Sequence, residues 1–383
     1  MSHPFTPAPQ QAEAIKAIKH WYTDPKSDQV FYLAGYAGTG KSSCTHYTID
    51  DLGLDIDEEQ DVLFGAYAGK AALVMRRNGM INASTIHRLI YTPVEDQETG
   101  KVSFILKYDE SPLHDTKLVV LDECSMIDSK MKADLLSFGK KVLVLGDPGQ
   151  LDPINGPPAF TKPNVFLTDI HRQAQDSPII LVSMLARLGE PLPYGDYGDV
   201  RIIRGSEIDI DELSRAEQVI TGKNATRKML NEEIKNYLGF TNVYPDKPGA
   251  KLICLKNNHQ VGLLNGMIMW TADKQKFMSK KNKFFTQSLV DDEQNLFEDL
   301  DIATAYFDGR DMTEKEENDL RRSKTIQLFD YGFCCTVHKS QGSQWDEVYV
   351  YDDGFGLWDM NLRRKFMYTA ITRAAKKLVI IRG

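Results

Sequence analysis

Short apolar runs recur along the chain, and segments of helical character lie between them. Strands that alternate with helices are typical of α/β folds, in which helices cover a mostly parallel sheet. The pattern therefore predicts an α/β protein. The clearest strands that we expect span residues 30–34, 62–66, 118–121, 142–145, 219–221, 347–351 and 378–381.

Two stretches interrupt this alternation, and we interpret both as insertions. Residues 91–109 could form a β-hairpin that turns around residues 97–100. Residues 245–330 are mixed in character, and the segment G-L-L-N-G-M-I-M-W within them predicts a turn at Asn265 and Gly266. No internal repeat or low-complexity tract stands out in the sequence.

Composition agrees with two domains of ordinary size. The 383 residues are 42% hydrophobic, which suffices for packed cores, and no segment has the uninterrupted apolar length of a membrane span. The first residues lack a basic start followed by an apolar stretch, so we expect no secretory signal and a cytoplasmic location. The five cysteines show no metal-ligand spacing, and we predict reduced thiols without zinc or disulfides.

The charge balance limits the kind of nucleic-acid binding that the chain could use. A net charge of −8 argues against a protein that coats nucleic acid through bulk electrostatics. Acidic residues gather at 50–61 and 291–301, which we interpret as solvated loops. A locally basic groove elsewhere on the surface therefore remains compatible with the composition.

The segment G-Y-A-G-T-G-K-S at residues 35–42 follows the apolar run 30–34 and precedes a segment that can form a helix. Its glycines allow a tight turn whose backbone N–H groups point at phosphate oxygens, beside the positive end of a helix. The lysine of such a loop reaches the β- and γ-phosphates, and the following hydroxyl holds Mg²⁺. We expect a nucleotide and Mg²⁺ to contact Gly35, Gly38, Thr39, Gly40, Lys41 and Ser42.

The segment V-V-L-D-E-C-S-M-I-D is an apolar strand that ends in two adjacent acids. Asp122 would bind Mg²⁺ through the water shell of the cation, which takes few protein carboxylates. Glu123 would orient and deprotonate the attacking water. A strand followed by a solvated turn is the alternative, but the position downstream of a phosphate loop favours a catalytic pair.

Three further residues carry chemistry that suits phosphoryl transfer. The apolar strand at 142–145 leads into G-D-P-G-Q-L, where the amide of Gln150 could sense the γ-phosphate. Arg172 in I-H-R-Q and Arg373 in Y-T-A-I-T-R-A could be arginine fingers that neutralise charge on the transferred group. Ordinary surface positions are the alternative for both arginines.

The ordered set of motifs resembles superfamily 1 helicases of the RecD and phage Dda type, and the likeness extends through nearly the whole chain. The matching segments are T-P-A-P-Q-Q-A-E-A-I, the phosphate loop, A-Y-A-G-K-A-A, A-S-T-I-H-R-L, D-E-C-S-M, G-D-P-G-Q-L, I-H-R-Q, T-V-H-K-S-Q-G-S and Y-T-A-I-T-R-A. The resemblance implies two RecA-like motor domains with parallel sheets, at residues 1–175 and 176–383. It also implies a hairpin or pin insertion at 88–113 and a β-barrel-like insertion at 245–330.

The resemblance further implies an ATP-dependent DNA helicase that moves 5′ to 3′ on single-stranded DNA and unwinds duplex. ATP would lie between the two domains, with Gln11 at the adenine, Gly342 near the nucleotide, and Arg172 and Arg373 reaching across. The expected DNA contacts are Ser84, Thr85, His87, Thr336, His338, Lys339 and Ser340. Their side chains can hold phosphate oxygens without reading sequence. Helix capping is the alternative for Ser84, since Ser and Thr before a helix are most often caps.

Both insertions suggest additional contacts with DNA. Phe104, with Tyr91 and Tyr108 as competitors, would stack on a base at the tip or edge of the hairpin, or else would pack the hairpin against the body. Lysines interleaved with Phe277, Phe284 and Phe285 could grip single-stranded DNA, although a solvated basic loop is the more ordinary interpretation.

The sequence departs from the family pattern in two places. Tyr67 and Ala68 stand where relatives have Pro and Thr, so a hydroxyl contact to DNA is missing there. Asp152 replaces a Pro in the stretch after Gln150, which could alter that loop.

Other classes of function share some of these motifs. A GTP-dependent switch would need N-K-x-D, and Asn282 and Lys283 are followed by two phenylalanines. A translocase or remodeller that moves on single-stranded DNA without strong unwinding would use the same motor. A non-motor binding protein is disfavoured because the catalytic residues are present. We expect a monomer that binds single-stranded DNA and duplex junctions, with replication or recombination proteins as further partners, in the cytoplasm of a bacterium or phage-infected host.

Overall fold

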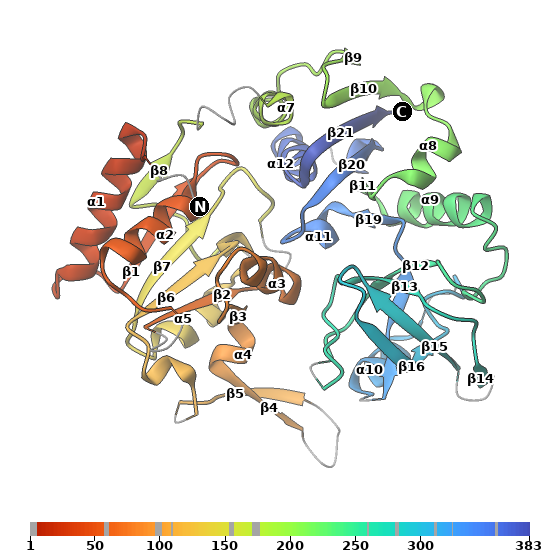
Figure 1. The fold of residues 1–383 in the computed structure, drawn as a ribbon, viewed down its shortest axis with the longest axis horizontal. Helices are drawn as coiled ribbons and strands as arrows, with labels where there is room; N and C mark the ends of the chain where they lie inside the picture. The colour runs from red at the N-terminus through yellow and green to blue at the C-terminus, as the bar shows by residue number, and fades with distance from the viewer. Residues whose placement is uncertain are drawn as a thin grey trace. The chain divides into compact units, whose positions relative to one another are not determined.

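The computed structural model divides the chain into two compact units (Figure 1). The first unit contains Met1–Val94, Ser103–Pro191 and Arg364–Thr372, and the second contains Glu95–Val102, Leu192–Arg363 and Arg373–Gly383. The structure describes residues 6–56, 61–95, 102–108, 110–152, 157–170, 177–258, 260–279, 283–309, 312–323, 325–356 and 359–383. Within these ranges, no helix combines the length and apolarity that crossing a bilayer requires.

The first unit is built on a six-stranded parallel sheet with the strand order β3-β2-β6-β7-β1-β8. Its strands are β1 (Val30–Gly35), β2 (Val62–Ala66), β3 (Ser84–Thr85), β6 (Leu118–Asp122), β7 (Lys141–Gly146) and β8 (Val165–Leu167). The four strands expected in this part of the chain are confirmed. The parallel sheet with helices between its strands confirms the α/β fold class.

Both faces of this sheet are buried, and the side chains of β1 show it directly. Phe31 and Leu33 belong to one apolar cluster, whereas Tyr32 and Ala34 belong to another. Successive side chains of a strand point to opposite faces, so the two clusters lie on opposite sides of the sheet. The helices around them are α1 (Pro9–Thr23), α2 (Lys41–Asp51), α3 (Gly69–Arg77), α4 (Ile86–Ile90) and α5 (Ser129–Leu136).

The hairpin expected at residues 91–109 is present. It consists of β4 (Tyr91–Glu95) and β5 (Val102–Leu106), which form a two-stranded sheet directly after α4. The turn between the two strands lies outside the described residues, so the predicted turn at 97–100 is not described.

The second unit contains another six-stranded sheet, with the order β19-β11-β20-β21-β10-β9. All its pairs are parallel except β9 with β10. The strands are β9 (Gly195–Asp196), β10 (Val200–Arg204), β11 (Gln218–Thr221), β19 (Cys334–Thr336), β20 (Trp345–Asp352) and β21 (Ala374–Arg382). Its helices include α8 (Ile210–Arg215), α9 (Asn224–Tyr237) and α11 (Val337–Ser340), while α12 (Met360–Ile371) begins in this unit and its residues from Arg364 onward belong to the first.

The insertion at 245–330 forms a mainly antiparallel sheet within the second unit, and it shares a core with the six-stranded sheet of that unit. Its elements are β12 (Lys251–Cys254), β13 (Ile268–Thr271), β14 (Phe277–Ser279), β15 (Phe284–Asp291), β16 (Leu296–Ala303), α10 (Glu314–Arg322), β17 (Ile326–Gln327) and β18 (Phe329–Tyr331). Leu252 and Phe285 of the insertion pack in one cluster with Val219 and Val379 of the parallel sheet. The turn expected at Asn265 and Gly266 is present, and Gly266 has a φ of 88°, which favours glycine.

The division into units differs in two places from the boundary expected after residue 175. Helix α7 (Pro178–Leu188) belongs to the first unit, and so does Arg364–Thr372 near the end of the chain. Periodicity reports on local structure and carries no information about which distant elements a segment packs against. The first unit therefore continues past residue 175 through α7, and the chain returns to this unit at Arg364.

Candidate nucleotide and DNA sites

The phosphate loop connects β1 to α2 and depends on glycine conformations. Gly38 and Gly40 have φ values of 78° and 82°, in the left-handed region that residues with a Cβ atom rarely adopt. A Cβ atom on Gly40 would also lie 2.4 Å from Nε2 of Gln11. The amide of Gln11 donates to the carbonyl of Thr39 at 3.0 Å, and its oxygen accepts from the Ala8 N–H at 2.9 Å. The first turn of α1 is therefore joined to the loop.

Lys41 opens α2 and folds back onto the loop. Its Nζ donates to the carbonyls of Gly35 and Tyr36 at 2.8 and 3.2 Å. The neighbouring Ser42 is exposed, so its hydroxyl is accessible to a ligand. The oxygens of a bound phosphate could replace these two carbonyl oxygens as partners of Nζ, because a hydrogen bond between two charged groups is stronger than one to a neutral carbonyl.

The sheet order explains why the acid pair lies near this loop. β6, β7 and β1 are consecutive neighbours in a parallel sheet, so Asp122, Gly146 and Gly35 all stand at carboxyl ends of strands. Ligands of open α/β sheets bind at this edge. Glu123 has a φ of 52°, a strained value that costs on the order of 1 kcal/mol for a residue with a side chain and is typical of functional sites.

The donor set suits Mg²⁺. This cation keeps several waters and takes one or two carboxylates together with phosphate oxygens, and Ser42 and Asp122 supply one hydroxyl and one carboxylate. Among the described residues, no group of three or more His, Cys, Asp or Glu side chains forms a metal-binding cluster. All five cysteines are buried free thiols, and burial raises the pKa of Cys124 to about 12.

The turn after β7 carries Gln150 and is centred on Asp147. Gln150 is buried, and its N–H donates to the carbonyl of Asp147 at 3.1 Å. The Asp147 carboxylate accepts from the Gly149 N–H at 2.9 Å and from the Tyr368 hydroxyl at 2.5 Å. Burial raises the pKa of Asp147 above its ordinary value, while the Lys41 cation and these hydrogen bonds act in the opposite direction.

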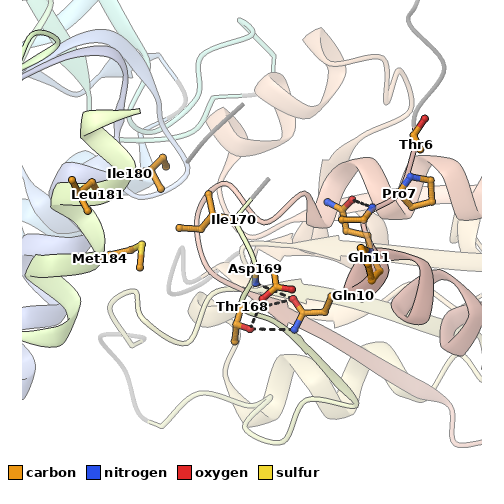
Figure 2. A pocket seen from close by; sticks show the side chains of 12 residues that line it. Thr6, Pro7, Gln10, Gln11, Thr168, Asp169, Ile170, Ile180, Leu181 and Met184 are labelled. Carbon is orange, nitrogen blue, oxygen red and sulfur yellow. Dashed lines mark hydrogen bonds between the residues drawn. The ribbon is translucent and has the colours of Figure 1, made fainter. Parts of the chain in front are cut away.

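A cavity of about 750 Å³ is lined in part by Gln11, the residue of α1 that contacts the phosphate loop (Figure 2). On one wall of the cavity, Gln10 joins α1 to the residues after β8, because its amide oxygen accepts from the N–H groups of Thr168 and Asp169, both at 2.9 Å. Figure 2 shows Ile180 and Met184 of α7 on the side opposite the glutamines. A cavity with one polar and one apolar wall suits a flat heteroaromatic base.

Of the two arginines expected at the nucleotide, the described residues include Arg373 and not Arg172. Arg373 is buried in the second unit, where its guanidinium donates to the carbonyl of Ser343 at 3.2 Å. Gly342 precedes that serine and has a φ of 70°.

In the first unit, the DNA candidates lie on β3 and α4. Thr85 is the helix cap, since its hydroxyl accepts from the Arg88 N–H at 3.3 Å, and Ser84 precedes the cap and is partly exposed. The His87 ring is half-buried, and burial lowers its pKa although Asp128 opposes the shift. The imidazole is therefore neutral at neutral pH and can still donate and accept hydrogen bonds.

His87 belongs to an aromatic cluster with Tyr67, Tyr91 and Phe104. The His87 ring centroid lies 5.6 Å from those of Tyr91 and Phe104 and 6.0 Å from that of Tyr67. Tyr91 is buried, and its hydroxyl donates to Asp134, so it has no free face for a base. Phe104 packs against His87 and Tyr91, as the second alternative expected, and it keeps 52% of its surface exposed, so stacking on a base stays a prediction. Tyr108 packs against Phe138, at a centroid distance of 4.9 Å.

In the second unit, the DNA candidates follow β19 and form α11. Ser340 is fully buried and its hydroxyl donates to the carbonyl of Val337 at 2.7 Å, so the expected direct phosphate contact does not fit this conformation. Thr336 is also buried. Lys339 donates to Oδ1 of Asn265 at 3.0 Å, and burial lowers the pKa values of both His338 and Lys339.

A cavity of about 320 Å³ lies beside Thr336 and Lys339, and it has a basic lining that sequence reasoning missed. Arg227 and Arg321 face it together with Lys339, although each arginine also pairs with a carboxylate, Asp330 and Glu317 respectively. Burial is the main cause of the lowered pKa of Lys339, and the two arginine cations add to it. Lys339 and Arg321 are exposed, and like charges that lie close together favour an anionic ligand. Arg227 and Arg321 lie in separate segments, and the short basic pairs Arg227-Lys228 and Arg321-Arg322 do not by themselves indicate that the two arginines meet at one cavity.

Of the residues in the insertion that could grip single-stranded DNA, Phe285 does not suit that role, and Lys280 and Lys281 lie outside the described residues. Phe285 is fully buried in the core of the second unit, so it cannot stack on a base. The strand alternation explains this, since β15 turns every second side chain inward. The side chain of Phe277 lies outside the described residues.

Comparisons with known proteins agree with this geometry. Residues 6–204 match the family model of the AAA domain, and residues 331–381 match that of the UvrD-like helicase C-terminal domain. The chain is 28% identical over 363 residues to the ATP-dependent RecD2 DNA helicase of Deinococcus radiodurans, covering 89% of this chain and 45% of that protein. It is 23% identical over 385 residues to the conjugal transfer protein TraA of Rhizobium radiobacter, covering 92% of this chain and 31% of TraA. The chain thus spans less than half the length of these curated relatives.

Solved structures of Pif1 helicases share the fold. The structure of two coordinating Pif1 helicases at forked double-stranded DNA superposes with a TM-score of 0.57 at 17% identity, covering 98% of this chain and 92% of that chain. Bacteroides Pif1 bound to single-stranded DNA gives a TM-score of 0.56 at 16% identity, with the same coverage of both chains. The AAA-domain match covers more than half of the 383 residues. The chain therefore belongs to the AAA domain family, and its UvrD-like C-terminal segment and its likeness to RecD2 support a RecD-like helicase of superfamily 1.

Proposed function

We propose that this chain is an ATP-driven DNA helicase that moves 5′ to 3′ on single-stranded DNA and unwinds duplex. The observation that carries the proposal is the convergence of the phosphate loop, the acid pair and the Gln150 turn at the carboxyl ends of β1, β6 and β7. The likeness to the RecD2 DNA helicase supports the choice of DNA as the track.

Hydrolysis would divide among the residues of this edge. Lys41 would leave the Gly35 and Tyr36 carbonyls and bind the β- and γ-phosphate oxygens. Glu123 would accept a proton from the attacking water, and the amide of Gln150 would distinguish the triphosphate from the diphosphate state. Ser42 and Asp122 would hold Mg²⁺, which neutralises phosphate charge when bound. Arg172, Arg373 and Gly342 remain assignments from the resemblance.

The adenine would enter the cavity beside Gln11. Its polar edge would face the glutamine amides, and its ring faces would contact the apolar wall formed by Ile180 and Met184. Because Gln11 also holds the Thr39 carbonyl, binding of the base and the position of the phosphate loop would be connected.

The DNA strand would contact each unit through residues already described. In the first unit, Ser84 and His87 are accessible, and in the second, Lys339 borders the basic cavity. Neutral donors and a lysine can hold phosphate oxygens without base specificity, which suits an enzyme that passes along any sequence. We propose Arg227 and Arg321 as additional phosphate contacts, because they line the same cavity.

The hairpin would separate the strands of the duplex. Phe104 offers an exposed aromatic face on β5, and stacking on a base is worth about 1 to 3 kcal/mol. The protein would work in the cytoplasm as a monomer at junctions of duplex and single-stranded DNA, together with replication or recombination proteins.

The deciding experiment measures ATP hydrolysis with and without single-stranded DNA, and then unwinding of duplexes with a 5′ or a 3′ tail. We expect hydrolysis to be stimulated by DNA and unwinding to require the 5′ tail. Stimulation without strand separation on either substrate would favour a translocase. Hydrolysis that is unaffected by DNA would contradict both motor functions.

A further inference from the structure

Tyr368 of α12 bonds two parts of the candidate nucleotide site that lie far from it and from each other in the sequence. It is 1% exposed and belongs to the first unit, within Arg364–Thr372. Its hydroxyl accepts from the Ala37 N–H of the phosphate loop at 2.9 Å and donates to Oδ2 of Asp147 at 2.5 Å. One side-chain oxygen therefore bonds the phosphate loop on one side and the turn after β7 on the other.

The geometry around this hydroxyl is tightly constrained. A Cβ atom on Gly149 would lie 2.9 Å from Cε1 of Tyr368, so the turn can pass over the ring only because residue 149 is glycine. A hydrogen bond from a hydroxyl to a carboxylate is charge-assisted and stronger than a neutral one. Leaving a buried hydroxyl or a buried N–H without a partner costs free energy. Both facts favour a fixed position of the Tyr368 side chain.

The turn that α12 holds is the one that carries Gln150. Asp147 accepts the N–H of Gln150 through its carbonyl at 3.1 Å, and the hydroxyl of Thr369 accepts the N–H of Leu151 at 3.1 Å. Tyr368 and Thr369 thus restrain the residues on both sides of Gln150. Burial and the Asp147 charge raise the pKa of Tyr368, so the hydroxyl stays protonated and keeps donating.

We propose that Tyr368 is a positioning residue for ATP hydrolysis, whose hydroxyl sets the Gln150 turn relative to the phosphate loop. The inference rests on the proposed ATPase function. Tyr368 acts through Asp147 and Ala37 rather than on the reacting atoms. Arg373, the expected arginine finger, follows five residues later in the chain and belongs to the second unit.

The test is Tyr368→Phe, which removes one oxygen and keeps the ring. Tyr349→Phe is the matched control, because Tyr349 is 2% exposed and its hydroxyl donates to Glu212 at 3.1 Å in the second unit. In Tyr368→Phe, we expect kcat for ATP to fall about tenfold, the effect of one hydrogen bond to a charged group, with KM changed by less than about twofold. The control should keep the wild-type kcat.

A second variant examines the same contact from its other side. Asp147→Asn should lower kcat, and the double variant should be less impaired than the product of the two single effects, because both remove one interaction. Melting temperatures measured in parallel identify loss of folding. An unchanged or increased kcat in folded Tyr368→Phe, an equal fall in the control, or fully independent effects in the double variant would overturn the inference.

The outcomes separate this inference from the proposed function. A wild-type protein without DNA-stimulated hydrolysis would contradict the helicase proposal, while its basal hydrolysis would still measure the Tyr368→Phe effect. A wild-type protein with stimulated hydrolysis that Tyr368→Phe does not alter would refute only the positioning role.

Discussion

Each six-stranded sheet of this chain has an interior strand that leads through a short connection with glycine into a helix, but the two connections have different contents. In the first unit, β1 and α2 are separated by the five residues 36–40, and in the second, β11 and α9 are separated by Gly222 and Lys223 alone. The first connection contains Gly38 and Gly40 and leads directly into Lys41, and the second consists of one glycine and one lysine. Architecture by itself therefore does not create a phosphate site.

The chain's own side chains fill the second connection. The Asp353 carboxylate accepts from the Thr221 hydroxyl and from the Lys223 N–H, both at 3.0 Å, at the start of α9. Phe355 covers the glycine so closely that a Cβ atom on Gly222 would lie 2.2 Å from its ring. An internal carboxylate thus occupies the place of an anionic ligand. Loop length and the neighbouring side chains therefore decide whether a helix N-terminus binds a ligand or stabilises the fold.

The largest difference is expected when the lysine at each of these two connections, Lys41 or Lys223, is replaced by alanine. Lys41→Ala should reduce ATP hydrolysis by about a thousandfold, since Lys41 would stabilise charge on the transferred group. Lys223→Ala should leave hydrolysis within about twofold of wild type, because Lys223 donates to the Asp353 carbonyl at 2.7 Å and is not among the residues proposed to bind the nucleotide. Steady-state hydrolysis at saturating ATP checks both. Equal losses in the two variants would remove the distinction between the loops.

The second effect concerns stability and is expected in the opposite connection. Asp353→Ala leaves the Thr221 hydroxyl and the Lys223 N–H without their carboxylate, which should lower the free energy of unfolding by about 2 kcal/mol. Asp346→Ala is the control, since Asp346 is exposed and pairs with Lys376 on the surface. Urea unfolding at neutral pH measures both. A loss no larger than that of the control would show that the internal carboxylate does not stabilise this connection.

The same variant has a defined pH dependence. Burial acts against ionisation of Asp353, but hydrogen bonds from Thr226, Lys223 and Phe355 hold its pKa below the usual value. A carboxyl group with a lowered folded-state pKa adds stability that is present at neutral pH and is lost as the pH falls through that pKa. The difference between wild type and Asp353→Ala should therefore shrink below about pH 4.

The hairpin allows a smaller effect to be tested in the first unit. Phe104→Ala should reduce the base pairs unwound per ATP several-fold and leave hydrolysis on single-stranded DNA unchanged, because Phe104 would act on the duplex and not on the nucleotide. Ile105→Ala is the control, as Ile105 is 54% exposed and Phe104 is 52% exposed on the same strand. If Phe104→Ala left unwinding per ATP unchanged, the pin assignment would be wrong.

The smallest expected effect is a change in salt dependence in the second unit. Removing one phosphate contact with Arg321→Ala should reduce the slope of log affinity for single-stranded DNA against log salt by about 0.7. Lys315→Ala removes an exposed cation of the same helix that does not line the basic cavity, and it should leave the slope unchanged. Fluorescence anisotropy across a salt series measures the slopes. Identical slopes in all three proteins would exclude Arg321 from the DNA contact.

Features encoded by neighbouring residues were predictable from the sequence. Apolar runs identified the central strands, and the spacing of glycine and lysine identified the phosphate loop, because both depend on local backbone geometry. The strands β10 and β19 were missed. V-R-I-I-R at β10 is interrupted by charge, and C-C-T at β19 is too short for periodicity to reveal. The hairpin was predicted, but the direction in which its aromatic residues face depends on their contact with His87.

Fold class, family and the nucleotide motifs were predictable from the sequence, because the alternation of apolar runs and the order of short motifs can be followed along the chain alone. The side chains that those motifs contact were decided by tertiary packing. Tyr368 bonds a residue 331 positions away, Ser340 is buried between the polar residues Lys339 and Gln341, and Phe285 is buried although Phe284 and Thr286 beside it are partly exposed. The physical reason is that burial and hydrogen-bond partners arise from packing between distant segments, which local patterns do not encode.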